Sequence, residues 1–257
     1  MVNKKIIIVT QARVGSSRFP EKVLQPLGKG TLLSTHLNRL KQSKIASKII
    51  VATTFEEKSS EIIRIAKELD VEVFQGSTND VLDRFYNAVK DINADYIVRV
   101  TSDCPLIDAQ LIDKVILFTI QNNLDYAANV FNVPYPDGQD IEVFKFSVLE
   151  KAWHESTLSS DREHVTPYIW KNSTIKGGNL FKSGNYDAPV NYYHIRMTVD
   201  EPEDLNTIKI LLENLGDEKT WNVYTDFLIN NLNLFKNQQI KRNEGYVKSL
   251  NNDEHEQ

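Results

Sequence analysis

The sequence has 257 residues, of which 41% are hydrophobic and 25% charged, and its formal net charge is −5. This composition is ordinary for a globular enzyme of one large domain, and the net acidity argues against a nucleic-acid partner. The single cysteine, Cys104, excludes an intramolecular disulfide and a Cys-rich metal site. No apolar run approaches the ~20 residues of a membrane span, and the first residues lack the apolar core of a signal peptide. We therefore expect a cytoplasmic protein with no membrane partner.

The first half of the chain alternates between strand-like and helix-like apolar patterns. In chain order the predicted elements are a strand at 6–9, a helix at 31–42, a strand at 48–53, a helix at 58–69, a strand at 71–74, a helix at 79–91, a strand at 95–101 and a helix at 108–121. This rhythm predicts an α/β fold of three layers, α/β/α, with a mainly parallel central sheet.

The second half is less regular. Its predicted elements are a strand at 141–144, helices at 147–155 and 161–170, a strand at 192–199, and helices at 201–215 and 220–232. The closing residues 251–257 are polar and are expected to fray. Neither the Gly-x-Gly-x-x-Gly nor the P-loop phosphate fingerprint is present, which argues against a standard dinucleotide dehydrogenase and a P-loop ATPase.

A polar loop, residues 11–22, follows the first predicted strand abruptly. It carries three cations and two hydroxyls, which are Arg13, Arg18, Lys22, Ser16 and Ser17. Open α/β sheets bind ligands at the carboxyl ends of their strands, and these side chains suit a polyanion such as a nucleoside triphosphate. The alternative is a solvated surface loop, in which Arg18 pairs with a structural carboxylate such as Glu21.

Two aspartates occupy equivalent places at the exits of later predicted strands. Asp103 follows the strand at 95–101 and precedes Pro105, and Asp200 follows the strand at 192–199 and precedes Pro202. Magnesium typically takes one or two protein carboxylates and completes its coordination with phosphates and water. The pair therefore predicts a metal site beside the polar loop, although Asp200 also suits a helix N-cap.

The loop sequence ARVGSSRFPEK resembles the A-R-x-x-S-x-R-L-P-x-K signature of bacterial sugar-acid cytidylyltransferases. Further segments resemble the group named after the spore coat polysaccharide protein SpsF, and they occur in family order: VFQGSTNDVLDRFYNAV, RVTSDCPLID, YPDGQDIEVF, SDREHVTPYI and RMTVDEPEDL. Two departures concern the loop, where Glu21 replaces the usual glycine and Phe19 the usual leucine. TSD in place of QGD makes 3-deoxy-manno-octulosonate a less expected substrate.

The resemblance implies a GT-A-like, Rossmann-like nucleotidyltransferase. Arg13 and Lys22 match family positions that hold the triphosphate, and Asp103 and Asp200 match the metal-binding carboxylates. Arg13, Lys22 and Asp103 are the expected catalytic residues. The other expected CTP contacts are Gln11, Ala12, Ser16, Ser17, Arg18, Gly76, Asp80 and Ser102. The expected acceptor contacts are Asp140, Glu142, Arg162 and His164.

Several of these residues could instead have a purely structural role. Asp80 could be a helix-face charge, Asp140 a turn residue beside Gly138, and His164 a structural hydrogen-bonding group. Cys104 is expected to serve packing, because no Cys-His pattern accompanies it.

The leading hypothesis is transfer of CMP from CTP to an acidic sugar, with magnesium as cofactor and release of pyrophosphate. The alternatives are a glycosyltransferase on the same fold, a cytidylyltransferase with a non-sugar acceptor and a non-catalytic nucleotide sensor. The chain contains no Asp-x-Asp, which counts against the glycosyltransferase. We expect a cytidylyltransferase domain at 1–235, in which 131–190 serve the acceptor and a homodimer interface, and a C-terminal extension at 236–257.

Overall fold

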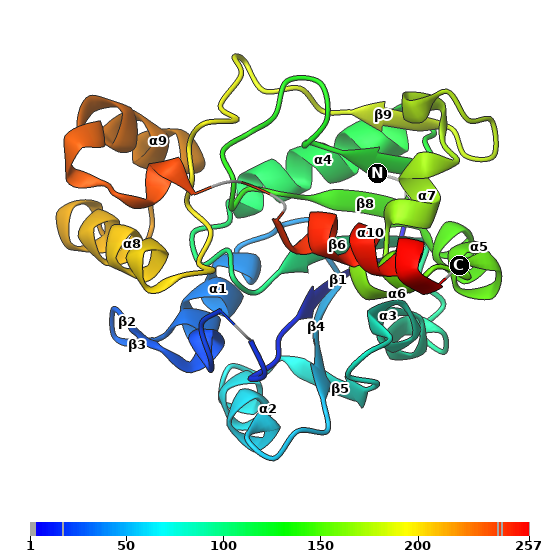
Figure 1. Cartoon of the computed structure of the whole chain (residues 1–257), viewed down its shortest axis with the longest axis horizontal. Coiled ribbons are helices and arrows are strands. Elements are labelled where there is room, and N and C mark those ends of the chain that lie inside the picture. The colour runs from blue at the N-terminus through cyan, green and yellow to red at the C-terminus, as the bar shows by residue number, and fades with distance from the viewer. Residues whose placement is uncertain (1–3, 17, 241, 243, 257) are drawn as a thin grey trace.

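The computed structural model describes residues 4–16, 18–240, 242 and 244–256 and is organised around one central β-sheet (Figure 1). Seven strands form this sheet in the order β5-β4-β1-β6-β8-β7-β9. Their bounds are β1 Ile6–Gln11, β4 Lys48–Thr54, β5 Glu72–Gly76, β6 Tyr96–Thr101, β7 Tyr126–Ala128, β8 Glu142–Lys145 and β9 Ser183–Asn185. A separate hairpin consists of β2, Pro26–Leu27, and β3, Gly30–Thr31.

The four strands β5, β4, β1 and β6 run parallel, which confirms the mainly parallel sheet. β8 pairs antiparallel with both β6 and β7. In the register of the parallel strands, Gln11 at the end of β1 lies opposite Thr101 at the end of β6. The polar loop after β1 therefore emerges beside the loop that carries Asp103.

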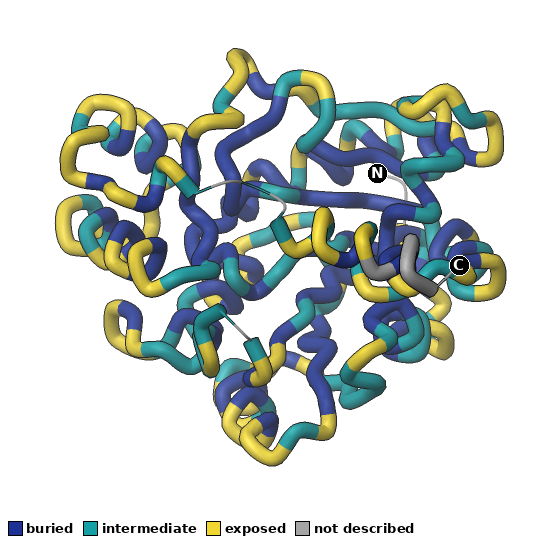
Figure 2. The backbone as a smooth tube through the Cα atoms, in the orientation of Figure 1, coloured by how far each residue is buried: buried dark blue, intermediate teal, exposed yellow. Residues whose placement is uncertain are grey.

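Helices cover both faces of the sheet, as the three-layer prediction requires. One apolar cluster joins a sheet face to α1 (Leu32–Leu40), α2 (Ser59–Glu68) and α4 (Ala109–Gln121). A second joins the other face to α3 (Val81–Val89), α5 (Phe146–Glu155) and α7 (Pro167–Lys171). The buried strands form the dark centre of Figure 2, and exposed residues gather on the outer turns. These two clusters hold the strand ends, and hence the loops after them, in fixed positions.

A third apolar cluster lies outside the sheet and involves α8, Pro202–Leu215, and α9, Trp221–Asn230. These two helices pack together at the left of Figure 1. The segment of residues 195–200, here called the strap, connects this cluster to the sheet and contributes Ile195, Met197 and Val199 to it.

The prediction of a strand at 192–199 is wrong, because the strap is extended but belongs to no described sheet. It makes a single bridge, Asp137 to Arg196, and Val199 N donates to Asp103 O at 2.8 Å. Apolar and polar residues alternate along the strap for a different reason than in a β-strand. The apolar residues pack against α8 and α9, whereas Arg196, Thr198 and Asp200 line a cavity on the other side.

Gly138 allows the turn of residues 136–139 to approach the strap closely. Its φ is +100°, and a Cβ at this position would lie 2.6 Å from the carbonyl carbon of Met197. Only glycine accommodates both the backbone conformation and the contact. Gly138 is therefore required for the packing of this turn against the strap as well as for the turn itself.

The helix predicted at 161–170 is two shorter helices, α6 (Ser159–His164) and α7. Val165 between them has a φ of 72°, and Pro167 begins α7. The positive φ of Val165 interrupts the helical backbone, and Pro167 occupies the first turn of α7, where its missing N–H leaves no hydrogen bond unmade.

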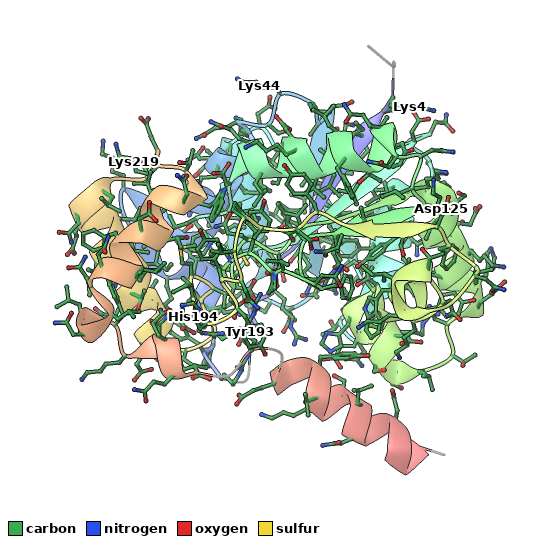
Figure 3. The ribbon with its side chains drawn as sticks, turned by 90° about the horizontal axis from the view of Figure 1, so that it is seen from above. Lys4, Lys44, Asp125, Tyr193, His194 and Lys219 are labelled. Carbon is green, nitrogen blue, oxygen red and sulfur yellow. The ribbon has the colours of Figure 1, made fainter. Side chains whose placement is uncertain are left out.

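The C-terminal extension contains α10, Glu244–Glu256, where residues 251–256 had been expected to fray. α10 lies in front of the sheet in Figure 1, and the turned view of Figure 3 shows it on the same side, beside the body of the molecule. Short 3-10 helices complete the described chain: η1 Lys22–Leu24, η2 Thr174–Lys176, η3 Leu232–Leu234 and η4 Asn237–Gln239. No described helix is both long and apolar enough to cross a membrane.

Candidate active site

One large cavity, of about 1020 Å³, opens at the carboxyl ends of β1 and β6. Its walls come from the polar loop after β1, the loop after β6, the strap, the turn at 137–140, helices α6 and α7, and α10. This is where open α/β sheets usually bind ligands.

Lys22, in the polar loop, joins the two aspartates that the sequence singled out. Its Nζ donates to Asp103 Oδ2 at 2.9 Å and to Asp200 Oδ1 at 2.8 Å. Burial disfavours the ammonium charge, but the two carboxylates outweigh burial and raise the pKa of Lys22 above its usual value. Burial likewise opposes the charge of Asp103, yet Lys22 holds the pKa of that carboxyl below its usual value. Lys22 and Asp103 are therefore both charged at neutral pH.

Arg196 fixes the position of Asp200 on the strap. Its buried guanidinium donates to Asp204 at 2.8 Å, to Asp137 at 2.9 Å and to Asp200 at 3.2 Å. Asp204 also accepts the backbone N–H of Asp200, so it caps the start of α8 while it orients the strap. A fork of this kind gives directional as well as electrostatic stabilisation.

The Asp103 and Asp200 carboxylates fit a divalent cation. Both have an oxygen within 3 Å of Lys22 Nζ, so a single divalent cation that displaces this ammonium would be in reach of both. The described residues contain no group of three or more acidic, histidine or cysteine ligands that could hold a metal ion. A cation at this pair would therefore take its remaining ligands from a phosphate-bearing substrate and water.

Two further arginines in the cavity wall have no acidic partner. Arg13 is exposed, Arg84 on α3 is only 1% exposed, and no described carboxylate lies within ion-pair distance of either. Arg84 donates to the carbonyl of Ser77, but its Nε has no hydrogen-bond partner. Burial, reinforced by the charge of Arg13, lowers the pKa of Arg84 to about 10. A buried cation without a counter-ion suits an anionic ligand.

His36, for which the sequence offered no partner, connects β1 to the Asp103 loop. Its ring is fully buried, with Nε2 2.9 Å from Thr10 Oγ1 and Nδ1 2.9 Å from the carbonyl oxygen of Cys104. Burial lowers the pKa of His36 to about 4, so the ring is neutral at pH 7. Cys104 itself is buried and, as expected, packs in the core.

Another part of the cavity wall carries most of the expected acceptor contacts and is here called the acceptor side. It consists of Arg99, Arg196, Arg242, several residues of the ranges 130–142 and 163–170, and α10. Arg99 binds Glu142 at 2.5 Å, and Arg242 binds Asp140 at 3.0 Å. Burial raises the pKa of Asp140, an effect that Arg242 opposes. Arg99 and Arg242 are therefore already paired with carboxylates.

The structure gathers most of the predicted site residues around this cavity. They are Gln11, Ala12, Arg13, Ser16, Arg18, Lys22, Ser102, Asp103, Asp140, Glu142, His164 and Asp200. Ser17 lies outside the described residues. Arg18 pairs with Asp200 at 3.1 Å, whereas Glu21 pairs with Lys58 and takes a φ of 56° where the family has glycine. The carboxylate of Glu21 is therefore neutralised by Lys58.

Three predicted residues lie beside the cavity and do not line it. Asp80 caps α3 and binds Arg162 at 2.6 Å, and Arg162 also donates to the carbonyl of Trp153. These bonds join α3 to α5 and α6, which makes them structural. Gly76 ends β5, where a side chain would press against Phe74 and Arg84.

Sequence reasoning missed several residues of the cavity wall, which are Arg84, Arg99, Arg196, Arg242 and Lys248. A signal existed for Arg99 and Arg196, because each interrupts an alternating apolar segment where an unpaired charge would be costly. For Arg242 and Lys248 the signal was the resemblance of the ending IKRNEGYVKSL to that of the family, which does not indicate where the segment folds back.

Known proteins are similar to this chain over most of its length. A sequence model of the cytidylyltransferase family matches residues 6–240. A Methanocaldococcus jannaschii protein of unspecified activity is 43% identical over 92% of this chain and 93% of its own length. The spore coat polysaccharide biosynthesis protein SpsF of Bacillus subtilis is 28% identical over 82% of this chain and 88% of its own length.

A solved structure is similar over nearly the whole molecule. A cytidylyltransferase from Leptospira borgpetersenii is 36% identical, has a TM-score of 0.86, and aligns over 93% of this chain and 100% of its own. This chain therefore belongs to the cytidylyltransferase family and is a CTP-dependent nucleotidyltransferase related to SpsF.

Proposed function

We propose that the protein transfers CMP from CTP to the hydroxyl of an acidic sugar and releases pyrophosphate, with magnesium as its cofactor. The observation that carries the proposal is the separation of charge in the cavity. Arg13 and Arg84 have no described carboxylate partner, whereas Lys22 lies between Asp103 and Asp200. This arrangement fits a triphosphate on the arginines and a cation at the two carboxylates.

The acidic-sugar part of the proposal is supported by resemblance. The loop of residues 12–22 resembles the signature of sugar-acid cytidylyltransferases, and the relative SpsF is named for polysaccharide biosynthesis. Use of CTP also agrees with the expected cytoplasmic location.

The reaction requires a bond from the acceptor oxygen to the α-phosphorus, while the bond from the α-phosphorus to the bridging oxygen of pyrophosphate breaks. The acceptor hydroxyl releases its proton to solvent. Arg13 and Arg84 would bind the triphosphate, and Lys22 would neutralise charge that develops on the departing pyrophosphate. Asp103 and Asp200 would hold magnesium, which supplies Lewis-acid polarisation of the phosphate oxygens when bound. Positioning of this kind needs no covalent intermediate.

A pyrophosphate-release assay tests the proposal. Purified protein is incubated with magnesium, each of CTP, UTP, ATP and GTP, and a sugar panel. The panel contains N-acetylneuraminate, 3-deoxy-manno-octulosonate, their methyl esters and neutral and amino sugars. We expect release with CTP and an acidic sugar only. Release that requires a neutral or amino sugar, or another nucleotide, contradicts the proposal.

A further inference from the structure

Helix α10 forms part of the acceptor side although it follows the region that the family model matches, which ends at residue 240. Gly245, Lys248 and Ser249 line the cavity and lie three and four residues apart, so they share one helix face. In Figure 1 the helix lies in front of the sheet, and in the turned view of Figure 3 it lies at the lower edge of the molecule.

Specific polar contacts hold α10 in this place. Ser249 Oγ donates to Glu163 Oε2 at 2.6 Å and lies 2.9 Å from His164 Nε2. The carboxylate of Asp253 accepts the backbone N–H of Ser160 at 2.9 Å. Tyr246 meets the rings of His164 and Trp170 edge-on. The helix is thus attached to α6 and α7 along its length.

Arg242 fixes the approach to the helix. Its side chain is 7% exposed, donates to Asp140 at 3.0 Å and to the carbonyl of Tyr135 at 3.3 Å, and stacks on Tyr193. Glu244, the first residue of α10, lies 3.8 Å from Arg18 of the polar loop. The C-terminal segment therefore contacts both the acceptor side and the loop expected to bind the triphosphate.

The charges of the acceptor side differ in whether they are paired. Arg99, Arg196 and Arg242 each bind a carboxylate, at 2.5, 2.9 and 3.0 Å respectively. Lys248 is exposed in the cavity wall and has no ion pair or hydrogen bond with any described residue. It is therefore the described cation of this side that is free to bind an incoming anion.

We propose that α10 is the acceptor-recognition element of this enzyme, and that Lys248 binds the carboxylate of the acidic acceptor. The inference rests on the proposed function, because a neutral acceptor would give Lys248 no ligand. An ammonium on a flexible stem can reach an anion without a fixed fork geometry. This contact would make Lys248 a residue that determines specificity for the acceptor, whereas the polar loop binds the nucleotide.

The test uses the full chain and three variants. Lys248→Met removes the charge and keeps the length of the side chain, and Lys248→Arg retains a cation. Lys44→Met is the matched control, since Lys44 lies at the opposite end of the view in Figure 3 from α10. KM is measured separately for CTP and for the most active acidic sugar of the panel, and rates are compared with the methyl ester of that sugar.

We expect Lys248→Met to raise KM for the acidic sugar about tenfold, as the loss of a charged hydrogen bond implies. KM for CTP and the rate with the methyl ester should not change, and Lys248→Arg should restore most of the loss. If Lys248→Met behaves like Lys44→Met, the inference is wrong while the proposed function stands. If the wild-type protein uses no acidic sugar, both fail. A parallel rise of KM for CTP would mark α10 as merely structural and would also contradict the inference.

Discussion

Several charged side chains of the cavity are buried in positions that stability of the fold alone does not explain. Arg84 is buried, its Nε has no hydrogen-bond partner, and the charge of Arg13 acts on it. Lys22 lies between two carboxylates. Removing a charged group from water is costly unless it is paired. Such groups at a strand-end cavity are best explained by the ligand that they bind.

Replacing Asp103 by asparagine should lower kcat by about 100-fold or more, because the site loses a hard anionic ligand at the reacting phosphate. The fold should persist, since asparagine has the same size. Asp226→Asn on the exposed face of α9 is a matched control. Steady-state rates at limiting magnesium and thermal melts of both variants provide the check. A near-normal rate for Asp103→Asn would show that Asp103 is not a metal ligand.

Arg84→Met should maintain or raise the melting temperature, because an apolar side chain of similar length removes a buried, partly unpaired charge. The same change should raise KM for CTP at least about tenfold, because a charge-assisted phosphate contact is lost. Calorimetric melts and nucleotide titrations measure the two effects. A lower melting temperature with unchanged KM would instead identify Arg84 as a structural residue.

His36 should make stability depend on pH. Its pKa is about 4 in the fold, against 6.5 in the unfolded chain, so between these values the unfolded state binds more protons. Its stabilising contribution is complete above pH 6.5 and is lost as the pH falls toward 4, by at most about 1.4 kcal/mol per pH unit. Urea unfolding of wild type and His36→Gln from pH 4 to 7.5 provides the comparison. Equal slopes in the two proteins would contradict this account.

At the scale of elements, the sequence predicted what depends on local pattern. The strands of the parallel half and the helices beside them follow from apolar periodicity, whereas the break that separates α6 from α7 was not predicted. The strap could not be distinguished from a strand. Ile195, Met197 and Val199 alternate as in a strand, and only the tertiary fold shows that they pack against α8 and α9. The positions of Arg242 and Lys248 likewise depend on where α10 docks.

Gly138→Ala tests whether the strap delivers Asp200 to the site. The new Cβ would collide with the Met197 backbone, so we expect a loss of about 2–4 kcal/mol in unfolding free energy together with a lower kcat. Gly177→Ala is the control, because Gly177 also has a positive φ of 82° but no atom lies within 4 Å of the added Cβ. Urea titrations and rates measured well below the melting point separate stability from activity. Equal effects of the two changes would show that the contact is unimportant.

At the scale of the whole molecule, the homodimer stays a prediction. The sequence predicts the interface in residues 131–190, and two aromatic residues of this segment, Tyr135 and Phe181, are buried within the single chain. Leu180 and Val190 remain as exposed apolar residues in the same region, at 42% and 55% exposure. These two residues are therefore the candidates for an apolar contact between subunits.

We expect a dimer in solution that Leu180→Glu weakens, because a charge in an apolar contact must be desolvated. Light scattering over a concentration series measures the mass of both proteins. Val247→Glu, on the exposed side of α10, is the control. A wild-type mass that stays monomeric at tens of micromolar would contradict the prediction.

The central claim is that CTP is cleaved between its α- and β-phosphates and that CMP passes to an acidic sugar. The most direct measurement follows the two ends of labelled CTP in the presence of magnesium and the acidic sugar that the panel identifies. Label at the α-phosphorus should appear in a sugar conjugate, and label at the γ-phosphorus in pyrophosphate, with equal yields that Asp103→Asn abolishes. Label from the α-phosphorus that remains in CDP or free CMP, or γ-label that appears as orthophosphate, would contradict the account.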